Sequence, residues 1–117
     1  YNRNNVFPAE AALASDFAIG HAVGSSAILE AALNGCRSIV LNPYDMKGSN
    51  IDIFNKANIL YDNMDLALSA ISLFREGKSE YQNLGSWEPI IDLFDSYRDG
   101  QSANRMRAVL ESALLIA

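Results

Sequence analysis

Two short apolar runs separated by a helix-forming segment constrain the fold of this chain most. The first run covers residues 16–20, and the second covers residues 38–41. Between them, residues 26–34 contain mainly good helix formers, and Gly35 follows as a helix-stop residue. Strands connected in this way, through a helix and more than a dozen residues, are parallel and have a right-handed crossover. The sequence therefore predicts a β-α-β unit with two buried strands.

Further elements are expected on both sides of this unit. Proline near the start of a helix-forming run, capping Asp or Asn residues and following glycines indicate where helices begin and end. The expected elements are a helix over residues 8–14, one helical turn over 51–55, a third short strand over 58–61, and helices that begin near residues 62, 86 and 99.

Each of the last three helices has an apolar stripe at helical spacing, which is typical of a face packed on a core. For the helix that ends near Glu76, the expected buried residues are Leu66, Ala70, Leu73 and Phe74. For the next helix, capped by Ser86, they are Trp87, Ile90, Ile91 and Phe94, with Pro89 tolerated in the first turn. For the last helix, capped by Asp99, they are Met106, Val109, Leu110, Ala113 and Leu114.

These elements predict an α/β fold with a partial Rossmann-like parallel sheet of about three strands, flanking helices and a helical C-terminal tail. Residues 1–62 would form the α/β part and residues 63–117 the tail. A doubly wound domain usually has five or six strands, so further strands are expected before Tyr1. The chain also begins without Met, and we interpret it as a piece of a longer polypeptide.

The composition excludes several classes of protein. Nine Lys and Arg against fourteen Asp and Glu give a net charge of −5, which disfavours a nucleic-acid partner. No apolar run reaches the roughly 20 residues needed to cross a membrane, and no signal-peptide pattern is present. A single free thiol fits a cytoplasmic location, which is therefore expected. Cys36 and His21 are the only residues of their types, so neither an internal disulfide nor a Cys/His zinc site can form, and no metal or cofactor is implied. Cys36 is expected to be a small, partly buried hydrophobe rather than a nucleophile.

The loop after the first strand is the strongest candidate for a binding site. Ligands of open parallel sheets lie beyond the carboxyl ends of the strands, where this loop is expected. Gly24 permits a close backbone approach, and Ser25 and Ser26 offer hydroxyl groups. The free N–H groups at the start of the following helix favour an anion, so the loop is a candidate phosphate-binding site. The alternative is that Ser26 only caps the helix.

Two further residues could extend this site. Glu30 is the only charged residue in a helix that is otherwise apolar nearly all round, which predicts a buried helix and a carboxylate in need of a partner. It follows Ser26 by one helical turn, so it could accept hydrogen bonds from a ribose next to a diphosphate at the helix start. The alternative is a partner within the protein. His21 could contact a phosphate or a sugar, or could simply bond to the loop backbone.

The same residues resemble the donor-binding segment of GT-B glycosyltransferases. The resemblance rests on residues 16–20, Gly24-Ser25-Ser26, Glu30-Ala31-Ala32, Gly35 and residues 39–41. A second similarity, to the tail of bacterial surface-polysaccharide biosynthesis proteins of this fold, rests on Leu84-Gly85-Ser86-Trp87, Asp92, Phe94-Asp95 and Arg98-Asp99-Gly100. By resemblance, Gly24, Ser25 and Ser26 would hold the diphosphate of a nucleotide-sugar donor, and Glu30 would bind its ribose.

The resemblance implies that the chain is the C-terminal, donor-binding part of a glycosyltransferase and is inactive alone. The acceptor site and the general base would come from a missing N-terminal domain, and association of two copies is a further option. Many retaining members have a second Glu eight residues before the ribose Glu, but Ala22 stands there in this chain. A related nucleotide-sugar epimerase is an alternative, although Asn42 and Pro43 replace the Arg often found after the second strand. A non-catalytic α/β interaction domain is the other alternative.

Overall fold

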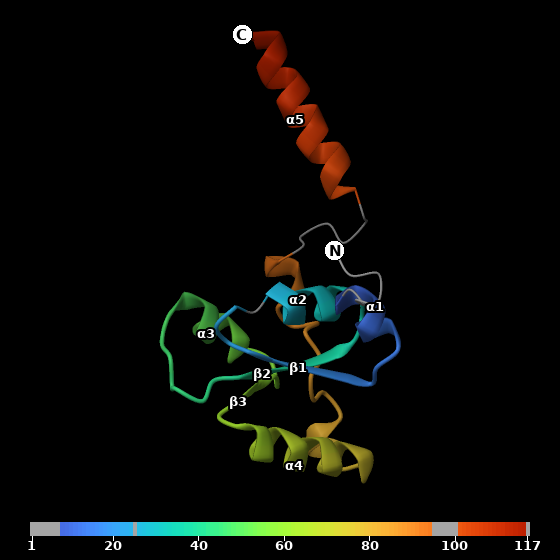
Figure 1. Ribbon diagram of the computed structural model, residues 1–117, viewed down its shortest axis with the longest axis vertical. Helices are drawn as coiled ribbons and strands as arrows, with labels where there is room; N and C mark the ends of the chain where they lie inside the picture. The colour runs from blue at the N-terminus through green and yellow to red at the C-terminus, as the bar shows by residue number, and fades with distance from the viewer. Residues whose placement is uncertain (1–7, 25, 95–100, 117) are drawn as a thin grey trace, which may run out of the picture.

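The chain forms a three-stranded parallel sheet with helices on both faces, as the computed structural model in Figure 1 shows. The structure describes residues 8–24, 26–94 and 101–116. The predicted α/β class, with about three parallel strands flanked by helices, is confirmed.

The sheet has the order β1-β2-β3, and both neighbouring pairs are parallel. Strand β1 is Phe17–His21, β2 is Arg37–Leu41 and β3 is Leu60–Tyr61, so each strand begins and ends within two residues of its predicted bounds. The register aligns His21 with Leu41, and Leu41 with Tyr61. The carboxyl ends of all three strands therefore share one edge with the loop that follows β1, as predicted.

Helices cover the two faces of the sheet unequally. Helices α1 (Pro8–Leu13) and α2 (Ser26–Leu33) lie on one face, and α4 (Met64–Arg75) lies on the other (Figure 1). The predicted turn before β3 is a short helix, α3 (Ser49–Phe54). These short helices depend on packing against the sheet, because a helix of one or two turns is not stable in water alone.

The alternation of side chains along β2 divides the core between the two faces. Val40 points to the face of α2, whereas Ile39 and Leu41 point to the face of α4. The first cluster comprises Ile28, Ala32, Val40, Phe54, Ile59, Trp87, Ile90 and Ile91. The second comprises Ile39, Leu41, Ala67, Ala70 and Leu84. Strand β2 is buried on both faces, as expected for the central strand of a parallel sheet.

Helix α4 begins where it was predicted to begin, but part of its buried face differs from the prediction. The Asn63 side chain accepts a hydrogen bond from the Leu66 amide at 2.9 Å, so Asn63 is the N-cap. Leu66 was expected to be buried, but it is 48% exposed. The helix instead turns Ala67, Ala70, Ile71 and Phe74 toward the sheet. This is an i, i+3, i+4, i+7 stripe that keeps the predicted Ala70 and Phe74 and has Ala67 and Ile71 in place of Leu66 and Leu73. Its small alanines let the helix approach the strands closely.

The predicted helix over residues 86–94 does not form. The segment is a series of tight turns that ends in a 3-10 helix, Ile91–Leu93. Pro89 disfavours the helical conformation at the preceding residue, Glu88, which opposes an α-helix that begins at Ser86. Trp87, Ile90 and Ile91 are nevertheless buried as predicted, because tertiary packing holds them in the core.

The last helix, α5 (Ser102–Ile116), forms but does not pack on the sheet. It projects away from the body in Figure 1. Its predicted buried face is wrong: Met106, Val109, Leu110 and Leu114 are 57–77% exposed, and Ala113 is exposed as well. The apolar spacing identified the helix correctly, but no other described part of this chain covers the stripe. The predicted cap, Asp99, lies outside the described residues.

Candidate functional site

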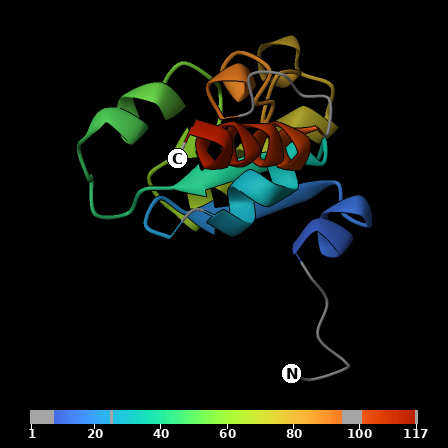
Figure 2. The same cartoon turned by 90° about the horizontal axis from the view of Figure 1, so that it is seen from above.

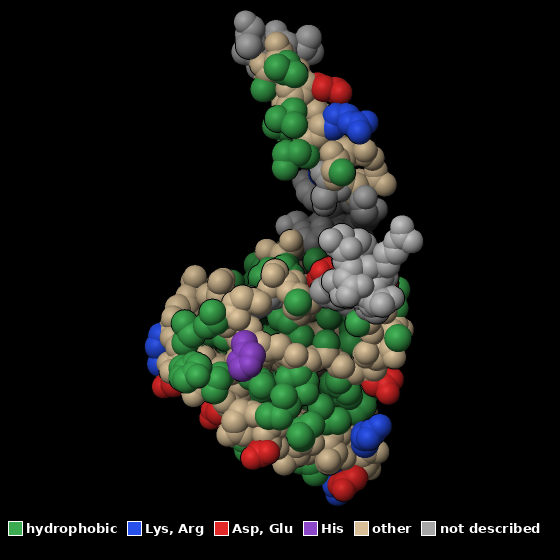
Figure 3. Space-filling view, in the orientation of Figure 1, with side chains coloured by type: hydrophobic (Ala, Val, Ile, Leu, Met, Phe, Trp, Pro, Cys, Tyr) green, Lys and Arg blue, Asp and Glu red, His purple; other side chains and the backbone are tan. Residues whose placement is uncertain are grey.

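A cavity lies at the carboxyl edge of the sheet, where the predicted loop leaves β1. It has a volume of about 330 Å³ and is lined by His21, Ala22, Val23, Leu41, Asn42, Pro43, Tyr44 and Met46. Its walls thus come from the ends of β1 and β2 and from the two loops that follow them. Figure 3 shows the histidine side chain at the surface with hydrophobic side chains beside it. This is the position at which open parallel sheets bind ligands.

The structure brings only some of the predicted site residues to this cavity. His21 is exposed and lines it. Gly24 and Ser26 lie in the adjoining loop and at the start of α2, and both are exposed. Gly24 has φ +68°, a left-handed conformation that glycine adopts readily. Ser25 lies outside the described residues.

Glu30 is half-buried on α2 and does not line the cavity. The expectation of a fully buried helix is wrong, because α2 exposes Ala27 and Leu33 on its outer side. Only Ile28, Ala31 and Ala32 are buried. The physical reason is that α2 covers one face of the sheet, and no other described layer covers its outer side. Glu30 therefore does not need an internal partner for its charge.

A hydrogen-bonded turn after β2 forms the opposite wall of the cavity. Asn42 is buried, and its side-chain Nδ2 donates to the Met46 carbonyl at 3.1 Å while its Oδ1 accepts from the Met46 N–H at 3.0 Å. These two bonds close the turn and hold Tyr44 at its tip, where it is 84% exposed. From the sequence, residues 42–45 could be placed at the ligand edge, but they had no assigned role. The structure identifies Tyr44 as an aromatic surface next to the cavity.

Lys47 is a cationic side chain near the cavity that was not predicted as a site residue from the sequence. It lines a second depression of about 230 Å³, which shares Ala22 and Met46 with the first cavity. Its ammonium group donates to the Asp45 carboxylate at 2.9 Å, and this hydrogen bond raises the pKa of Lys47 above its ordinary value. Both groups are highly exposed, so the pair contributes little to folding. The signal in the sequence was a lysine close after a strand end, which is too common to single out.

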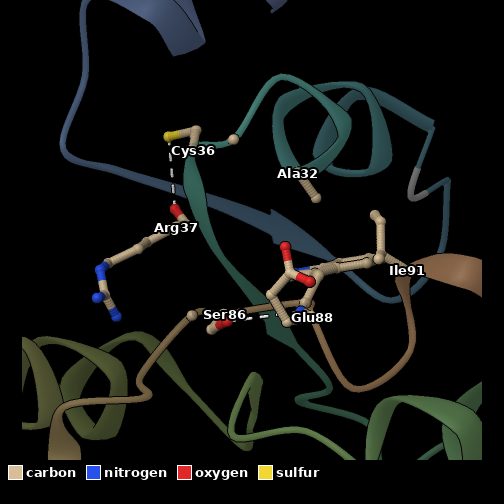
Figure 4. Close-up of a pocket in the computed structure, with 9 residues that line it drawn as sticks. Ala32, Cys36, Arg37, Ser86, Glu88 and Ile91 are labelled. Atoms are coloured by element: carbon tan, nitrogen blue, oxygen red, sulfur yellow. Dashed lines mark hydrogen bonds between the residues drawn. The ribbon is translucent and has the colours of Figure 1, made fainter. Parts of the chain in front are cut away.

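The pocket in Figure 4 lies at the other edge of the sheet, next to the amino end of β2. It has a volume of about 170 Å³, and its walls include Arg37 and Glu88. The Arg37 guanidinium is turned away from the Glu88 carboxylate and donates to the Gln82 and Leu84 carbonyls at 3.0 and 2.7 Å. It also lies 4.5 Å from the centre of the Phe74 ring. Arg37 thus ties β2 to the segment after α4 and has a structural role.

Cys36 in this region is buried, as predicted. Burial raises the pKa of its thiol, and the negative charge of Asp16 raises it further. We expect Cys36 to be alkylated by iodoacetamide at pH 8 at least about tenfold more slowly than glutathione, since both the thiolate fraction and access are reduced. The measurement is the rate of mass addition in the folded chain, and the same chain in urea is the control. Labelling as fast when folded as when unfolded would contradict the structural role.

Comparison of the chain with protein-family models, with curated proteins and with solved structures gives no match. Within the described residues, none of the helices has the length and apolar character required to span a membrane.

Proposed function

We propose that this chain is the donor-binding part of a GT-B-type glycosyltransferase, which binds a nucleotide-sugar during the synthesis of a polysaccharide or glycoconjugate in the cytoplasm. The observation that carries the proposal is the position of the β1–α2 loop. The parallel strands end at one edge, the loop there contains Gly24 at φ +68°, and an open cavity adjoins it. The sequence resemblance falls on the same loop.

In this proposal, the N–H groups at the start of α2 bind the diphosphate of the donor. The positive end of the helix dipole favours the charge that develops on the leaving diphosphate during sugar transfer. Lys47 lines the neighbouring depression and would add a positive charge when its ammonium group leaves the Asp45 carboxylate and binds a phosphate. The acceptor and the general base would be supplied by another domain, so the chain alone is expected to bind a donor weakly and not to transfer sugar.

Tyr44 and His21 would contact the rest of the donor. An exposed aromatic ring beside an apolar cavity can stack against a nucleobase, an interaction worth about 1–3 kcal/mol per base in nucleic-acid complexes. His21 lines the same cavity and can bond to a phosphate or a hydroxyl group. Glu30 retains its proposed ribose contact only if the donor extends from the loop along the outer side of α2.

A second candidate function is a non-catalytic interaction domain. It is favoured by the exposed apolar side chains of α5, because large uncovered apolar patches mark sites of association. In that case, the β1–α2 loop would have only a structural role.

The test is a titration of the ¹⁵N-labelled chain with UDP, GDP, CDP and CMP, followed by amide chemical shifts. We expect at least one nucleotide to shift the Gly24, Ser26 and Tyr44 amides with a dissociation constant near the millimolar level, which corresponds to about 4 kcal/mol. Tyr44→Ala should weaken binding by about tenfold through loss of stacking. Glu30→Gln should do the same if the ribose lies along α2, because charge-assisted hydrogen bonds contribute about 1.5–3 kcal/mol.

Matched controls separate binding from folding. Tyr81→Ala and Glu80→Gln change residues of the 3-10 helix Ser79–Tyr81, which lines neither cavity at the carboxyl edge, so neither should change nucleotide affinity. Absence of a saturable shift for all four nucleotides in a folded chain would favour the interaction domain. Unchanged affinity in Glu30→Gln alone would remove the ribose contact and leave the rest of the proposal intact.

A further inference from the structure

The turn that ends α2 contains the only asparagine–glycine pair of the chain, Asn34-Gly35. Helix α2 lies on the outside of the sheet next to α1 (Figure 1 and Figure 2), and both residues of the pair are exposed. Among the described residues, none beyond the immediate chain neighbours has an atom within 4 Å of the place that a Cβ atom would take at Gly35. Asparagine followed by glycine is especially prone to spontaneous deamidation, because glycine has no Cβ atom to hinder ring closure. The pair is therefore open to water and has no steric protection.

Deamidation is an intramolecular acyl transfer followed by hydrolysis. The backbone nitrogen of the glycine loses its proton to the solvent and attacks Cγ of the asparagine side chain. The bond from Cγ to the side-chain nitrogen breaks, the nitrogen takes up a proton and ammonia leaves, so that a succinimide ring remains. Water then opens the ring at one of its two carbonyls. Opening at one gives aspartate, and opening at the other gives isoaspartate, whose main chain is one methylene group longer.

Both groups that react are held by the end of α2. The Gly35 N–H donates to the Ala32 carbonyl at 3.0 Å, with Gly35 at φ +84°. The Asn34 side-chain Nδ2 donates to the Glu30 carbonyl at 2.8 Å. The attacking nitrogen is thus held with its proton, and the leaving amide is directed back toward the helix. Attack on Cγ requires both hydrogen bonds to break first.

Breaking these bonds needs only a local opening of the helix. Helix α2 has eight residues, and the ends of helices open at a lower free energy than the core. We propose that Asn34 is a deamidation site of this chain, and that opening of the last turn of α2 limits its conversion to aspartate and isoaspartate. The proposal does not depend on nucleotide binding, because it concerns the end of α2 that lies away from the loop of Gly24.

The products change the junction between α2 and β2. Aspartate at position 34 adds a negative charge at the negative end of the helix dipole and loses the amide donor to the Glu30 carbonyl. Isoaspartate lengthens the main chain directly before Cys36, which is buried and whose N–H donates to the Ala31 carbonyl at 3.1 Å. Figure 4 shows Cys36 between the turn that leaves α2 and the start of β2. Both products therefore disturb the entry to the central strand.

The test is an incubation of the whole chain at mildly alkaline pH, folded in buffer and unfolded in guanidinium chloride. Mass spectrometry of proteolytic fragments detects the replacement of NH₂ by OH at residue 34, and chromatography separates the isoaspartyl fragment. We expect Asn34 to convert in the folded chain at least about tenfold more slowly than in the unfolded chain, which corresponds to an opening free energy of at least about 1.4 kcal/mol.

A glycine substitution tests whether opening of the helix end is the limiting step. Leu33→Gly weakens the last turn of α2 and should raise the rate in the folded chain about fivefold, relative to the same variant unfolded. Leu110→Gly is the matched control, because it makes the same change at an exposed leucine of α5, and it should leave the rate at Asn34 unchanged. No acceleration in Leu33→Gly would overturn the role of the helix end.

The aspartate product can be made directly. Asn34→Asp should lower the melting temperature by about 2–6 °C, because its charge opposes the helix dipole. Asn50→Asp places the same change in the first turn of α3, where a carboxylate is favourable, and should not lower it. Equal conversion of Asn34 in the folded and unfolded chains would overturn the protection by α2. Conversion in the unfolded chain with none in the folded chain would overturn the site itself.

Discussion

Trp87→Ala is expected to lower the free energy of unfolding by about 3–5 kcal/mol, which approaches the whole stability of many small domains. Trp87 is buried and packs at 5.5 Å from the Phe54 ring and 5.6 Å from the Phe94 ring, measured between ring centroids. Its indole N–H also donates to the Ser38 carbonyl at 2.9 Å. The alanine variant therefore leaves a cavity and a buried acceptor without its donor. The measurement is equilibrium unfolding in urea followed by circular dichroism.

Two variants keep this prediction testable if Trp87→Ala does not fold. Trp87→Phe retains most of the ring packing but removes the hydrogen bond to Ser38, so it should cost about 1–3 kcal/mol. Leu93→Ala in the neighbouring 3-10 helix is the control, since Leu93 is 61% exposed and its truncation should change stability by less than about 0.5 kcal/mol. Similar losses for Leu93→Ala and Trp87→Ala would show that the indole is not central to the core.

Gly85→Ala is expected to have the second-largest effect, and Gly77→Ala provides a matched control. The two glycines have nearly the same backbone angle, φ +74° and +79°. A Cβ atom at Gly85 would lie 2.9 Å from the Arg37 Cβ and 3.0 Å from the Ser38 backbone nitrogen, whereas nothing lies within 4 Å at Gly77. Both variants should lose about 1–2 kcal/mol from the left-handed conformation.

Only Gly85→Ala should lose a further ~1–3 kcal/mol, because the added methyl group must push β2 away from the segment after α4. The difference between the two unfolding free energies therefore measures the close approach alone. Equal losses in urea unfolding would mean that the backbone at Gly85 moves aside without cost, which would contradict the tight contact with β2.

Local sequence patterns were sufficient to predict most of the fold. Apolar runs identified the three strands, and glycine closed the first run and Asn42-Pro43 the second. The helix after the third strand was expected to be capped by Asp62 or Asn63, and Asn63 is the cap, because capping depends on a few adjacent residues. The errors arose where distant parts of the chain decide the outcome. Residues 86–94 have helical spacing, but Pro89 disfavours the helix. Tight turns and a 3-10 helix instead place the apolar side chains in the core. The stripe of α5 has the same spacing, yet spacing alone does not say whether a partner surface is present.

The candidate site was predicted less completely than the fold. The loop of Gly24 could be placed at the ligand edge because strand direction follows from the β-α-β pattern. The aromatic wall could not be predicted, since Tyr44 owes its position to the two hydrogen bonds between Asn42 and Met46. The interpretation of Glu30 assumed that an apolar helix is buried on all sides. Whether it is depends on layers that lie outside the helix itself.

The hydrogen bonds of Ser38 have a consequence for how this chain is made. Its N–H donates to the Gly85 carbonyl at 2.8 Å and its carbonyl accepts the Trp87 indole, so the amino end of β2 is completed by residues almost fifty positions later. During synthesis, β1 and β2 can meet once residue 41 has left the ribosome. At about 5–20 residues per second, Gly85 follows roughly 2–9 s later. For that interval the nascent β2 carries an unfinished edge and an uncovered apolar face, which is the form of the chain that a chaperone would bind.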